Sequence, residues 1–393
     1  MIRQKNHKYR KVLIVANEWS RNGGLEIVTQ DIARTFAELG WNVTVVPAGG
    51  TGKSETLSNG VQLKWLPPRG RVAQSLWCRY LRWIVLPYFI KRHLKDGGLL
   101  IFGHVRLLPL IDRLPESPKI SRWVWTHGVD AWGKTVRHWM PRLNQLDNIV
   151  AVSEYTAGHE RQEGAATRVS VVLNSIDTER FTPTTTPEKI RRDEILICSR
   201  LCAAEKYKGH EVLFEALPIA EKLLGRRLKL RIIGTGDDEL RLRQRAKELN
   251  VAERVLFCGR VTDEELLEAY RHCGVFAMPS RAEYRPDTDD WAGEGFGLVY
   301  VEAEACGRPV VASSEGGAPE TILHERTGLL ADPRCPRANA EAIARILSDD
   351  AWADELGRAG RAHAVEHFSF ESFKRRIREA AAADDKLQKL GCV

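Results

Sequence analysis

The residue types and spacings best suited to chemistry lie in the segment 293–307, which reads Gly-Glu-Gly-Phe-Gly-Leu-Val-Tyr-Val-Glu-Ala-Glu-Ala-Cys-Gly. Three glycines crowd the expected start of a helix, so backbone N–H groups could approach an anion there. Glu294 stands before this helix, and we expect Glu302 about two turns inside it. A carboxylate accepts hydrogen bonds from paired hydroxyls, such as those of a sugar ring or a ribose. Tight packing of a strand on a helix would also explain the glycines, and the Glu spacing alone is not specific.

A cationic cluster lies in the segment 199–210, Ser-Arg-Leu-Cys-Ala-Ala-Glu-Lys-Tyr-Lys-Gly-His. It follows an expected strand and therefore offers Arg200, Lys206 and Lys208 at the carboxyl end of that strand. Cations in this position can neutralise a diphosphate, and an arginine fork fits phosphate oxygens. The alternative is an ordinary solvated charge run.

Two further junctions join an expected strand to a glycine turn. One contains Gly234 and the other precedes Arg260 and Val261. Each junction is ordinary by itself. Because the carboxyl ends of parallel strands meet at one edge of a sheet, four such junctions in one domain favour a ligand site.

Two features of the first half could face the same ligand. Gly23 and Gly24 form a turn after the first expected strand, and His127 directly follows the strand expected at 123–126. A single histidine is more often a structural residue than a functional one.

The elements that must position these residues alternate along the chain as short β-branched runs and amphipathic stretches, which is typical of βαβ units with parallel sheets. A Thr/Pro stretch at 180–188 is the expected linker. We therefore predict an α/β protein of two doubly wound, Rossmann-like domains, 1–180 and 190–366, with a C-terminal helix at about 367–390 that could return to the first domain. Ligands bind at the carboxyl ends of such strands, and a cleft between two such domains is the expected active site. The expected strands are 11–16, 43–46, 99–102, 123–126, 149–152, 169–173, 194–198, 228–233, 255–258, 275–278 and 309–312.

With these residues in place, the chain resembles the retaining glycosyltransferases of family 4, which have the GT-B architecture. The Glu-x7-Glu signature of that family stands here as Glu294 and Glu302, within Glu-Gly-Phe-Gly-Leu-Val-Tyr-Val-Glu-Ala-Glu-Ala-Cys-Gly-Arg-Pro-Val-Val-Ala-Ser. The match extends from about 195 to 330 and includes Gly-Gly-Ala-Pro-Glu at 316–320. The resemblance implies two Rossmann-like domains facing a central cleft. It also implies transfer of a hexose-type sugar from a UDP- or GDP-sugar to a glycan or lipid-linked acceptor, in bacterial lipopolysaccharide, exopolysaccharide or glycolipid synthesis.

The same resemblance assigns roles on the donor side. Arg200 and Lys208 should hold the diphosphate, Glu294 should contact the transferred sugar, and Glu302 should bind the ribose hydroxyls. Lys208 is preferred over Lys206 because the lysine of the family directly precedes a glycine. The nucleobase should lie against the backbone of Arg260 and Val261. The remaining residues expected to bind the donor are Gly234, Gly295, Phe296, Gly297, Leu298 and Val299.

On the acceptor side, members of the family have a histidine after the strand that corresponds to 123–126, and a glycine turn near the donor phosphate. We therefore expect His127 to position the sugar through hydrogen bonds, and Gly23 and Gly24 to lie near the phosphate and the acceptor. No second residue presents itself as a nucleophile for double displacement. The resemblance implies front-face transfer, in which the leaving phosphate helps to deprotonate the acceptor and cations stabilise the departing diphosphate.

A polar stretch at 281–292 contains Asp287-Thr-Asp289, a D-x-D triplet. In the other glycosyltransferase architecture, GT-A, such a triplet binds a divalent metal. Here we favour a solvated or acceptor-facing loop, because cationic phosphate ligands are already present. We expect no metal and no cofactor, since the nucleotide-sugar is a substrate.

The net charge of +7 is divided unevenly. Residues 1–180 hold 26 basic and 15 acidic residues, whereas the remainder holds 33 and 37. This asymmetry predicts an anionic partner for the first half. Residues 71–95 mix six basic residues with five aromatic ones around Pro87, which should interrupt a helix. The stretch could lie on an anionic membrane surface or contact a lipid-linked acceptor, and an ordinary packed helix is the alternative. No motif for nucleic-acid binding is present.

The bulk composition is that of a globular protein, with 43% hydrophobic and 28% charged residues. No run approaches the roughly 20 apolar residues of a membrane helix. The eight cysteines stand singly, which favours a reducing compartment. We expect a cytoplasmic protein, with peripheral attachment to the inner face of the cytoplasmic membrane as one possibility. A nucleotide-sugar epimerase and a non-catalytic sugar-nucleotide-binding protein are the alternatives, and a dinucleotide oxidoreductase is disfavoured because no GxGxxG follows the first strand.

Overall fold

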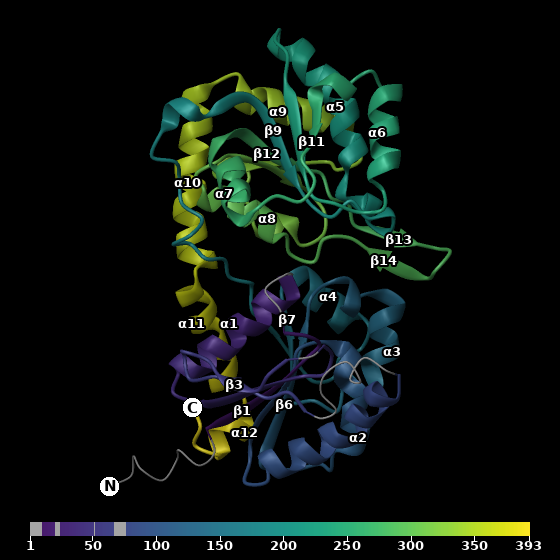
Figure 1. The fold of residues 1–393 in the computed structure, drawn as a ribbon, viewed down its shortest axis with the longest axis vertical. Helices are drawn as coiled ribbons and strands as arrows, with labels where there is room; N and C mark the ends of the chain where they lie inside the picture. Colours follow the sequence, from purple (N-terminus) through teal and green to yellow (C-terminus); the bar gives the residue numbers. More distant parts are fainter. Residues whose placement is uncertain (1–9, 20–23, 51, 67–75) are drawn as a thin grey trace. The chain divides into compact units, whose positions relative to one another are not determined.

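The computed structural model describes residues 10–19, 24–50, 52–66 and 76–393 (Figure 1). The chain divides into a first unit, Met1–Leu173 with Phe373–Val393, and a second unit, Asn174–Ser372. The first unit ends before the predicted residue 180, because the following residues pack on the second unit. There the backbone N–H of Ile176 donates to the carbonyl of Phe368 at 2.9 Å, and the ring of Phe181 meets that of Tyr270 edge-on.

The first unit is built on an eight-stranded sheet with the order β3-β4-β2-β1-β5-β6-β7-β8. All pairs are parallel except β3 with β4, which form a short antiparallel edge that the sequence did not predict. The strands are β1 Lys11–Ala16, β2 Asn42–Pro47, β3 Glu55–Thr56, β4 Gln62–Leu63, β5 Gly98–Phe102, β6 Ile120–Thr126, β7 Asn148–Ala151 and β8 Arg168–Val171. The helices are α1 Gly24–Glu38, α2 Leu76–His93, η3 Val105–Arg113, η4 Val129–Ala131, α3 Gly133–Leu143, α4 Glu154–Gln162, α11 Phe370–Ala382 and α12 Asp385–Lys389.

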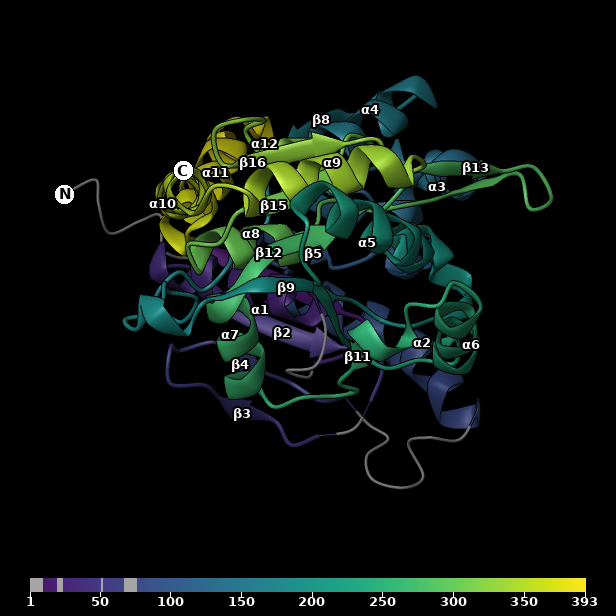
Figure 2. The ribbon, with the colours of Figure 1, turned by 90° about the horizontal axis from the view of Figure 1, so that it is seen from above.

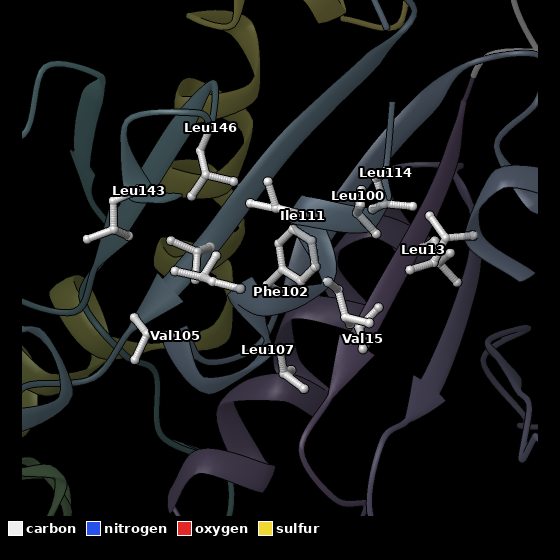
Figure 3. Packing of buried hydrophobic residues seen from close by; sticks show 14 of the residues in the cluster. Leu13, Val15, Leu100, Phe102, Val105, Leu107, Ile111, Leu114, Leu143 and Leu146 are labelled. Carbon is white, nitrogen blue, oxygen red and sulfur yellow. The ribbon is translucent and has the colours of Figure 1, made fainter. Parts of the chain in front are cut away.

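The core of the first unit lies between this sheet and the helices α2, η3 and α3 (Figure 3). Leu13 and Val15 of β1 and Leu100 and Phe102 of β5 point into it. Strands that are apolar at nearly every position are typical of a parallel sheet covered on both faces. Because these strands are packed on both faces, the residues that follow their carboxyl ends are held in defined positions.

Helix α2 runs without a break through Pro87, contrary to the predicted interruption. Leu86 and Ile90 on either side of the proline are buried in the core, so packing holds the helix across it. The partly buried rings of Trp83 and Phe89 also pack against the core, whereas Tyr88 is 66% exposed. Residues 71–75 of the predicted membrane-facing stretch lie outside the described residues. Trp83 and Phe89 thus pack on the core with part of each ring, and contact of this stretch with a membrane stays a prediction.

The C-terminal helices complete the first unit. Asp384 caps α12 by accepting the backbone N–H groups of Lys386 and Leu387. The same buried carboxylate accepts a hydrogen bond from Ser121 Oγ at 2.5 Å and one from Trp123 Nε1 at 2.7 Å, both on β6. One carboxylate thus joins the end of the chain to the strand that precedes His127.

The second unit is built on a six-stranded parallel sheet with the order β11-β10-β9-β12-β15-β16. The direction of the crossovers changes between β9 and β12, and ligands bind at such switch points of doubly wound sheets. The strands are β9 Arg191–Cys198, β10 Lys229–Ile233, β11 Val255–Phe257, β12 Cys273–Met278, β15 Val310–Ser313 and β16 Gly328–Ala331. The helices are η5 Pro187–Lys189, η6 Ala203–Lys208, α5 His210–Leu224, α6 Glu239–Glu248, η7 Ala252–Arg254, α7 Asp263–His272, α8 Leu298–Ala305, η8 Ala318–Glu320, α9 Pro336–Leu347 and α10 Asp350–Phe368.

Two predictions about this unit need correction. The polar stretch 281–292 forms an antiparallel hairpin of β13 Glu283–Arg285 and β14 Asp290–Ala292, which extends from the body of the unit (Figure 2). Glu302 is the fifth residue of α8, little more than one turn inside the helix, because α8 begins only at Leu298. Strand β16 was also missed.

Within the described ranges, none of the helices has the length and apolar character needed to cross a membrane.

We predict that Asp384→Ala destabilises the first unit by about 3 kcal/mol, because the buried hydroxyl of Ser121 and the start of α12 lose their acceptor, and Trp123 Nε1 keeps only its bond to Ser121 Oγ at 3.0 Å. Native-state hydrogen exchange of the β6 amides measures this change. The matched control is Asp385→Ala, which removes an exposed carboxylate next to it and should change stability by no more than about 0.5 kcal/mol. Unaltered protection of β6 in Asp384→Ala would show that the capping carboxylate is dispensable.

Candidate functional site

The loops at the carboxyl edge of the second sheet pack backbone against backbone through glycines. A Cβ on Gly234 would lie 1.8 Å from the carbonyl oxygen of Ser199, and one on Gly236 would lie 1.9 Å from that of Leu201. The backbone N–H of Gly234 also donates to the carbonyl of Gly259 at 3.0 Å. Only glycine permits these approaches, so the loops after β9, β10 and β11 form one connected surface.

Lys208 is held at this surface by the turn that follows it. It ends η6, and Gly209 then takes a left-handed conformation with φ 81°. A Cβ at Gly209 would lie 2.2 Å from the carbonyl oxygen of Pro279, the residue after β12. The end of η6 is therefore fixed against the end of a neighbouring strand.

An ion pair joins Lys208 to Glu294. The Nζ of Lys208 lies 2.5 Å from Oε2 of Glu294, and the two side chains are only 13% and 18% exposed. Burial alone would lower the pKa of Lys208, but the charge of Glu294 and the neighbouring Tyr207 raise that pKa above its ordinary value. Lys208 is therefore a charged, partly desolvated cation at neutral pH, which makes it a strong ligand for an anion.

A second pair of glycines fixes the loop of Glu294. The N–H of Gly317 donates to the carbonyl of Glu294 at 2.9 Å, and a Cβ on Gly317 would lie 2.2 Å from the carbonyl oxygen of Gly295. Gly297 has φ 99° and caps α8, so the first amides of the helix at Leu298 and Val299 follow this turn directly.

Phe296 between these glycines is buried against Phe368, with ring centroids 5.8 Å apart. Its side chain anchors the loop, and only its backbone could contact a ligand. The start of α8 therefore provides backbone amides next to the Lys208–Glu294 pair, the arrangement that suits an anion.

Glu302 lies further along α8 and accepts a hydrogen bond from the hydroxyl of Tyr270 at 2.7 Å. Burial raises the pKa of Glu302, and the hydrogen bond from Tyr270 opposes that rise. Tyr270 on α7 orients one carboxylate oxygen. Sequence reasoning missed it, because a tyrosine within an amphipathic helix is typical of an ordinary core position.

The other predicted donor residues differ in their surroundings. The side chain of Arg200 is 78% exposed and forms an ion pair with Glu205. Lys206 is exposed and borders a small cavity that Asp238 also lines. Of the two candidate lysines, the structure thus places Lys208 beside Glu294.

A cavity of about 450 Å³ opens beside Val261, next to the exposed Arg260. Its size is within the range of small-molecule sites. It lies next to the ends of β10 and β11, and its lining residues are Arg191, Arg231, Ile233, Cys258, Val261, Glu265, Glu268, Ala269 and His272.

In the first unit, His127 follows β6 and is fixed by two contacts. Its backbone N–H donates to Asp130 Oδ1 at 2.9 Å, and its Nε2 lies 2.9 Å from the carbonyl oxygen of Gly103. Because a carbonyl only accepts, Nε2 carries a proton, and in the neutral ring Nδ1 is then the accepting nitrogen. Gly24 is the first residue of α1, and Gly23 lies outside the described residues.

Two partners of His127 were missed from the sequence. The ring of His104 lies 6.0 Å from that of His127, and its Nε2 is 3.7 Å from Asp130 Oδ2. Burial lowers the pKa of His104, although Asp130 opposes this effect. His104 follows β5 closely, as His127 follows β6, and these neighbouring parallel strands end at the same edge of the sheet. The position of His104 just after a strand could therefore have predicted that it lies near His127.

Asp287 and Asp289 lie in the turn of the β13–β14 hairpin, where Asp289 accepts a hydrogen bond from the Tyr284 hydroxyl at 2.6 Å. In the part of the chain that the structure describes, no three His, Cys, Asp or Glu side chains are grouped so as to hold a metal ion.

Two family models match the chain. The model of glycosyl transferases group 1 matches residues 187–363, and the model of glycosyltransferase family 4 matches residues 22–180. Each match covers most of one structural unit.

Among curated proteins, the chain is similar to the GDP-mannose-dependent alpha-(1-6)-phosphatidylinositol monomannoside mannosyltransferase of Mycolicibacterium smegmatis. The two are 34% identical over 303 residues, which make up 72% of this chain and 74% of the relative. The protein of the same name from Mycobacterium tuberculosis is 33% identical over 61% of this chain, and the chain spans 62% of that relative.

Among solved structures, Anabaena HepE bound to UDP and glucose has a TM-score of 0.73 at 20% identity, with 95% of this chain and 99% of HepE aligned. Sucrose-phosphate synthase of Thermosynechococcus elongatus has a TM-score of 0.74 at 22% identity, with 95% and 98% aligned. At these identities the likeness establishes the fold.

From these matches and the two Rossmann-like units, the chain belongs to the nucleotide-sugar glycosyltransferases of the GT-B fold, with a family 4 region followed by a group 1 region.

Proposed function

We propose that this protein is a retaining hexosyltransferase that uses GDP-mannose in preference to UDP-sugars and transfers the sugar to a lipid-linked glycan. The observation that carries this proposal is the Lys208–Glu294 ion pair at the carboxyl edge of the second sheet. It brings together a cation suited to a diphosphate and a carboxylate suited to sugar hydroxyls.

Donor binding would exchange one anion for another at Lys208. The diphosphate replaces Glu294 as the partner of Nζ, and the released carboxylate then accepts hydrogen bonds from the hydroxyls of the transferred sugar. Arg200 can turn from Glu205 to the diphosphate, because its side chain is mostly exposed. Glu302, oriented by Tyr270, accepts the ribose hydroxyls.

In the proposed chemical step the sugar passes directly from the donor to the acceptor, and no covalent intermediate with the enzyme is formed. The bond between the anomeric carbon and the phosphate oxygen breaks, and the acceptor oxygen forms its bond on the same face of the sugar. The acceptor proton passes to the departing phosphate oxygen. Lys208 and the first amides of α8 stabilise the negative charge that develops on the diphosphate.

His127 would contribute from the first unit. With the proton on Nε2 directed to Gly103, Nδ1 can accept a hydrogen bond from a sugar hydroxyl. Asp130 accepts a hydrogen bond from the backbone N–H of His127 and so holds the residue in place.

The mannosyltransferase relatives support GDP-mannose as the donor and a phosphatidylinositol glycolipid as the kind of acceptor. A Corynebacterium glutamicum relative that is 30% identical over 59% of this chain is also a GDP-mannose-dependent mannosyltransferase of a lipid. A lipid acceptor favours peripheral attachment at the inner face of the cytoplasmic membrane. Glycolipid synthesis is therefore the setting that we propose, ahead of lipopolysaccharide and exopolysaccharide.

A hydrolysis assay tests the proposed function. The protein is incubated without acceptor in a panel of GDP-mannose, UDP-glucose, UDP-galactose and UDP-N-acetylglucosamine, and release of the nucleoside diphosphate is followed with and without EDTA. We expect GDP-mannose to be cleaved fastest and EDTA to leave the rate unchanged. Silence across the panel with folded protein contradicts a transferase, and a strong effect of EDTA contradicts metal independence. Appearance of an isomerised nucleotide-sugar would indicate an epimerase.

We predict that Lys208→Ala lowers the rate of donor cleavage by about 100-fold, since it removes a preorganised cation from the leaving diphosphate. Lys206→Ala is the matched control, because Lys206 is an exposed lysine two positions earlier and should lose less than about threefold. Steady-state kinetics of both variants decide between the two lysines. The reverse order of effects would assign the diphosphate to Lys206.

Glu302→Ala and Glu294→Ala should separate binding from turnover. Glu302→Ala is expected to weaken binding of the free nucleoside diphosphate by about tenfold, through loss of charge-assisted hydrogen bonds to the ribose. Glu294→Ala should mainly lower kcat. Because burial raises the pKa of Glu302, the affinity of the unmodified protein should fall as the pH drops through that raised pKa, since the protonated carboxyl is a weaker acceptor.

Titration calorimetry over a pH series measures these affinities. Glu264→Ala, an exposed residue of α7, serves as the control. Equal affinity of Glu302→Ala and the unmodified protein would show that the ribose assignment is wrong.

A further inference from the structure

A cavity of about 420 Å³ opens at the amino edge of the first sheet, where its parallel strands begin. Arg122 is the third residue of β6, and the register of β6 with β7 places it beside Asp147. Five chain steps separate Arg122 from His127 along the strand, a span of about 16 Å. The cavity is therefore distinct from the carboxyl edge that bears His127. Its lining residues are Glu116, Ser117, Pro118, Arg122, Asn144, Gln145, Leu146 and Lys386.

Arg122 is a buried cation without a carboxylate partner. It is only 4% exposed. Its Nη2 donates to the backbone carbonyl of Pro115, and among the described residues this carbonyl is the only acceptor of its guanidinium. Burial lowers the pKa of Arg122, and the charges of Asp147 and Glu116 oppose that fall without forming an ion pair with the guanidinium. An arginine stays charged at neutral pH, so Arg122 brings a positive charge and unused N–H donors to the wall of the cavity.

The backbone of Arg122 is held in place independently of its side chain. Its N–H donates to Asp147 Oδ2 at 2.9 Å, and its carbonyl accepts the N–H of Asp147 at 2.9 Å. A desolvated charge without an anionic partner is costly. An anion that enters the cavity would supply this partner and would require no change in the strand.

Two other segments offer donors to the same cavity. Lys386 on α12 pairs with Asp147 at 2.9 Å, and its ammonium has three N–H donors, so it can bind a further acceptor. The hydroxyl of Ser117, which accepts the backbone N–H of Lys119 at 3.2 Å, can itself donate. Donors that come from several segments suit the tetrahedral oxygens of a phosphate group better than the two coplanar oxygens of a carboxylate.

Glu116 is the one acidic residue of the lining, and it opposes an anion. Its side chain is exposed, so water and salt screen its charge. Removal of this charge should therefore strengthen the binding of an anion, whereas removal of the charge of Arg122 should weaken it. Opposite effects of two neighbouring substitutions distinguish a site in this cavity from a general attraction to a basic surface.

We propose that this cavity binds the phosphate group of a small phosphorylated molecule, with Arg122 as its main ligand and Lys386 and Ser117 beside it. The volume is within the range of small-molecule sites and leaves room for a body of the size of a sugar. A bound phosphate would join α12 to β6 in addition to the bonds of Asp384 (Figure 1). The ligand would thus stabilise the first unit and would take no part in sugar transfer.

The test measures binding of mannose 6-phosphate, inorganic phosphate and mannose to the full chain by titration calorimetry, with GDP present to occupy the donor site. We expect both phosphate compounds to bind and mannose to show no binding. Arg122→Gln should weaken the binding about tenfold because it removes the charge, and Arg122→Lys about threefold because it removes the fork. Glu116→Gln should strengthen the binding about threefold.

Lys119→Gln is the matched control. Lys119 is an exposed lysine close to Arg122 in sequence, and it is absent from the lining of the cavity. Its substitution removes the same charge as Arg122→Gln and should change the affinity by less than about twofold.

Hydrogen exchange locates the site in the unmodified protein, so the test does not depend on the folding of Arg122→Gln. Mannose 6-phosphate should increase the protection of residues 116–122, 144–147 and α12, and leave α8 unchanged.

Four results would overturn the proposal. They are absence of binding by either phosphate compound, protection confined to α8, equal losses of affinity in Lys119→Gln and Arg122→Gln, and weaker binding in Glu116→Gln. Binding of phosphatidic acid vesicles through Arg122, without binding of the soluble compounds, would assign the phosphate to a lipid and also overturn it. The inference does not depend on the transfer reaction, since none of the lining residues is proposed to act in it. Absence of donor hydrolysis would contradict the transferase proposal alone.

Discussion

The ion pair between Lys208 and Glu294 depends on close backbone packing at one edge of one sheet. Lys208 ends a short helix whose next residue, Gly209, is pressed against the carbonyl of Pro279. Glu294 stands in a loop pressed against Gly316 and Gly317. A side chain at these glycines would separate the loops, and the two charges would no longer meet. The ion pair therefore depends on backbone contacts that only glycine can make.

The partial burial of this ion pair bears on the exchange of partners that we propose for donor binding. A partly buried ion pair is costly to break by deleting one partner, because the other charge is left desolvated and unpaired. The exchange of Glu294 for a diphosphate that we propose would avoid that cost, since Lys208 would keep an anionic partner throughout. Tyr270 holds one carboxylate oxygen of Glu302, and Asp130 holds the backbone of His127. In the function that we propose, the other oxygen of Glu302 and the Nδ1 of His127 would accept hydrogen bonds from the substrate.

Much of this site could be predicted from the sequence because parallel strands end at a shared edge. The glycine turn at Gly234, the cations of 199–210 and the segment of Glu294 each follow a strand, so their convergence needs no knowledge of side-chain contacts. Contacts between residues distant in sequence could not be predicted in this way. Asp384 bonds to residues of β6 that lie more than 250 positions earlier in the sequence, and nothing in the local composition around it indicates that partner.

The sequence of the β13–β14 hairpin contains a strand pattern, but its high polarity led to the prediction of a loop. Glu-Tyr-Arg and Asp-Trp-Ala alternate polar and aromatic residues on either side of a Pro-Asp-Thr-Asp turn, the pattern of two short strands. The high polarity of the stretch favoured a loop instead. Similarly, the start of α8 at Leu298 follows from the left-handed conformation of Gly297, which only the structure reveals.

If a diphosphate replaces Glu294 as the partner of Lys208, a double-mutant cycle on nucleoside diphosphate affinity must show that the two side chains are coupled. Calorimetry would compare the unmodified protein, Lys208→Ala, Glu294→Gln and the double variant, with GDP and UDP as ligands. We expect Lys208→Ala to weaken binding by about tenfold. Glu294→Gln should strengthen it severalfold, with a larger gain when Lys208 is present. Additive effects, or an unchanged affinity in Lys208→Ala, would contradict the exchange.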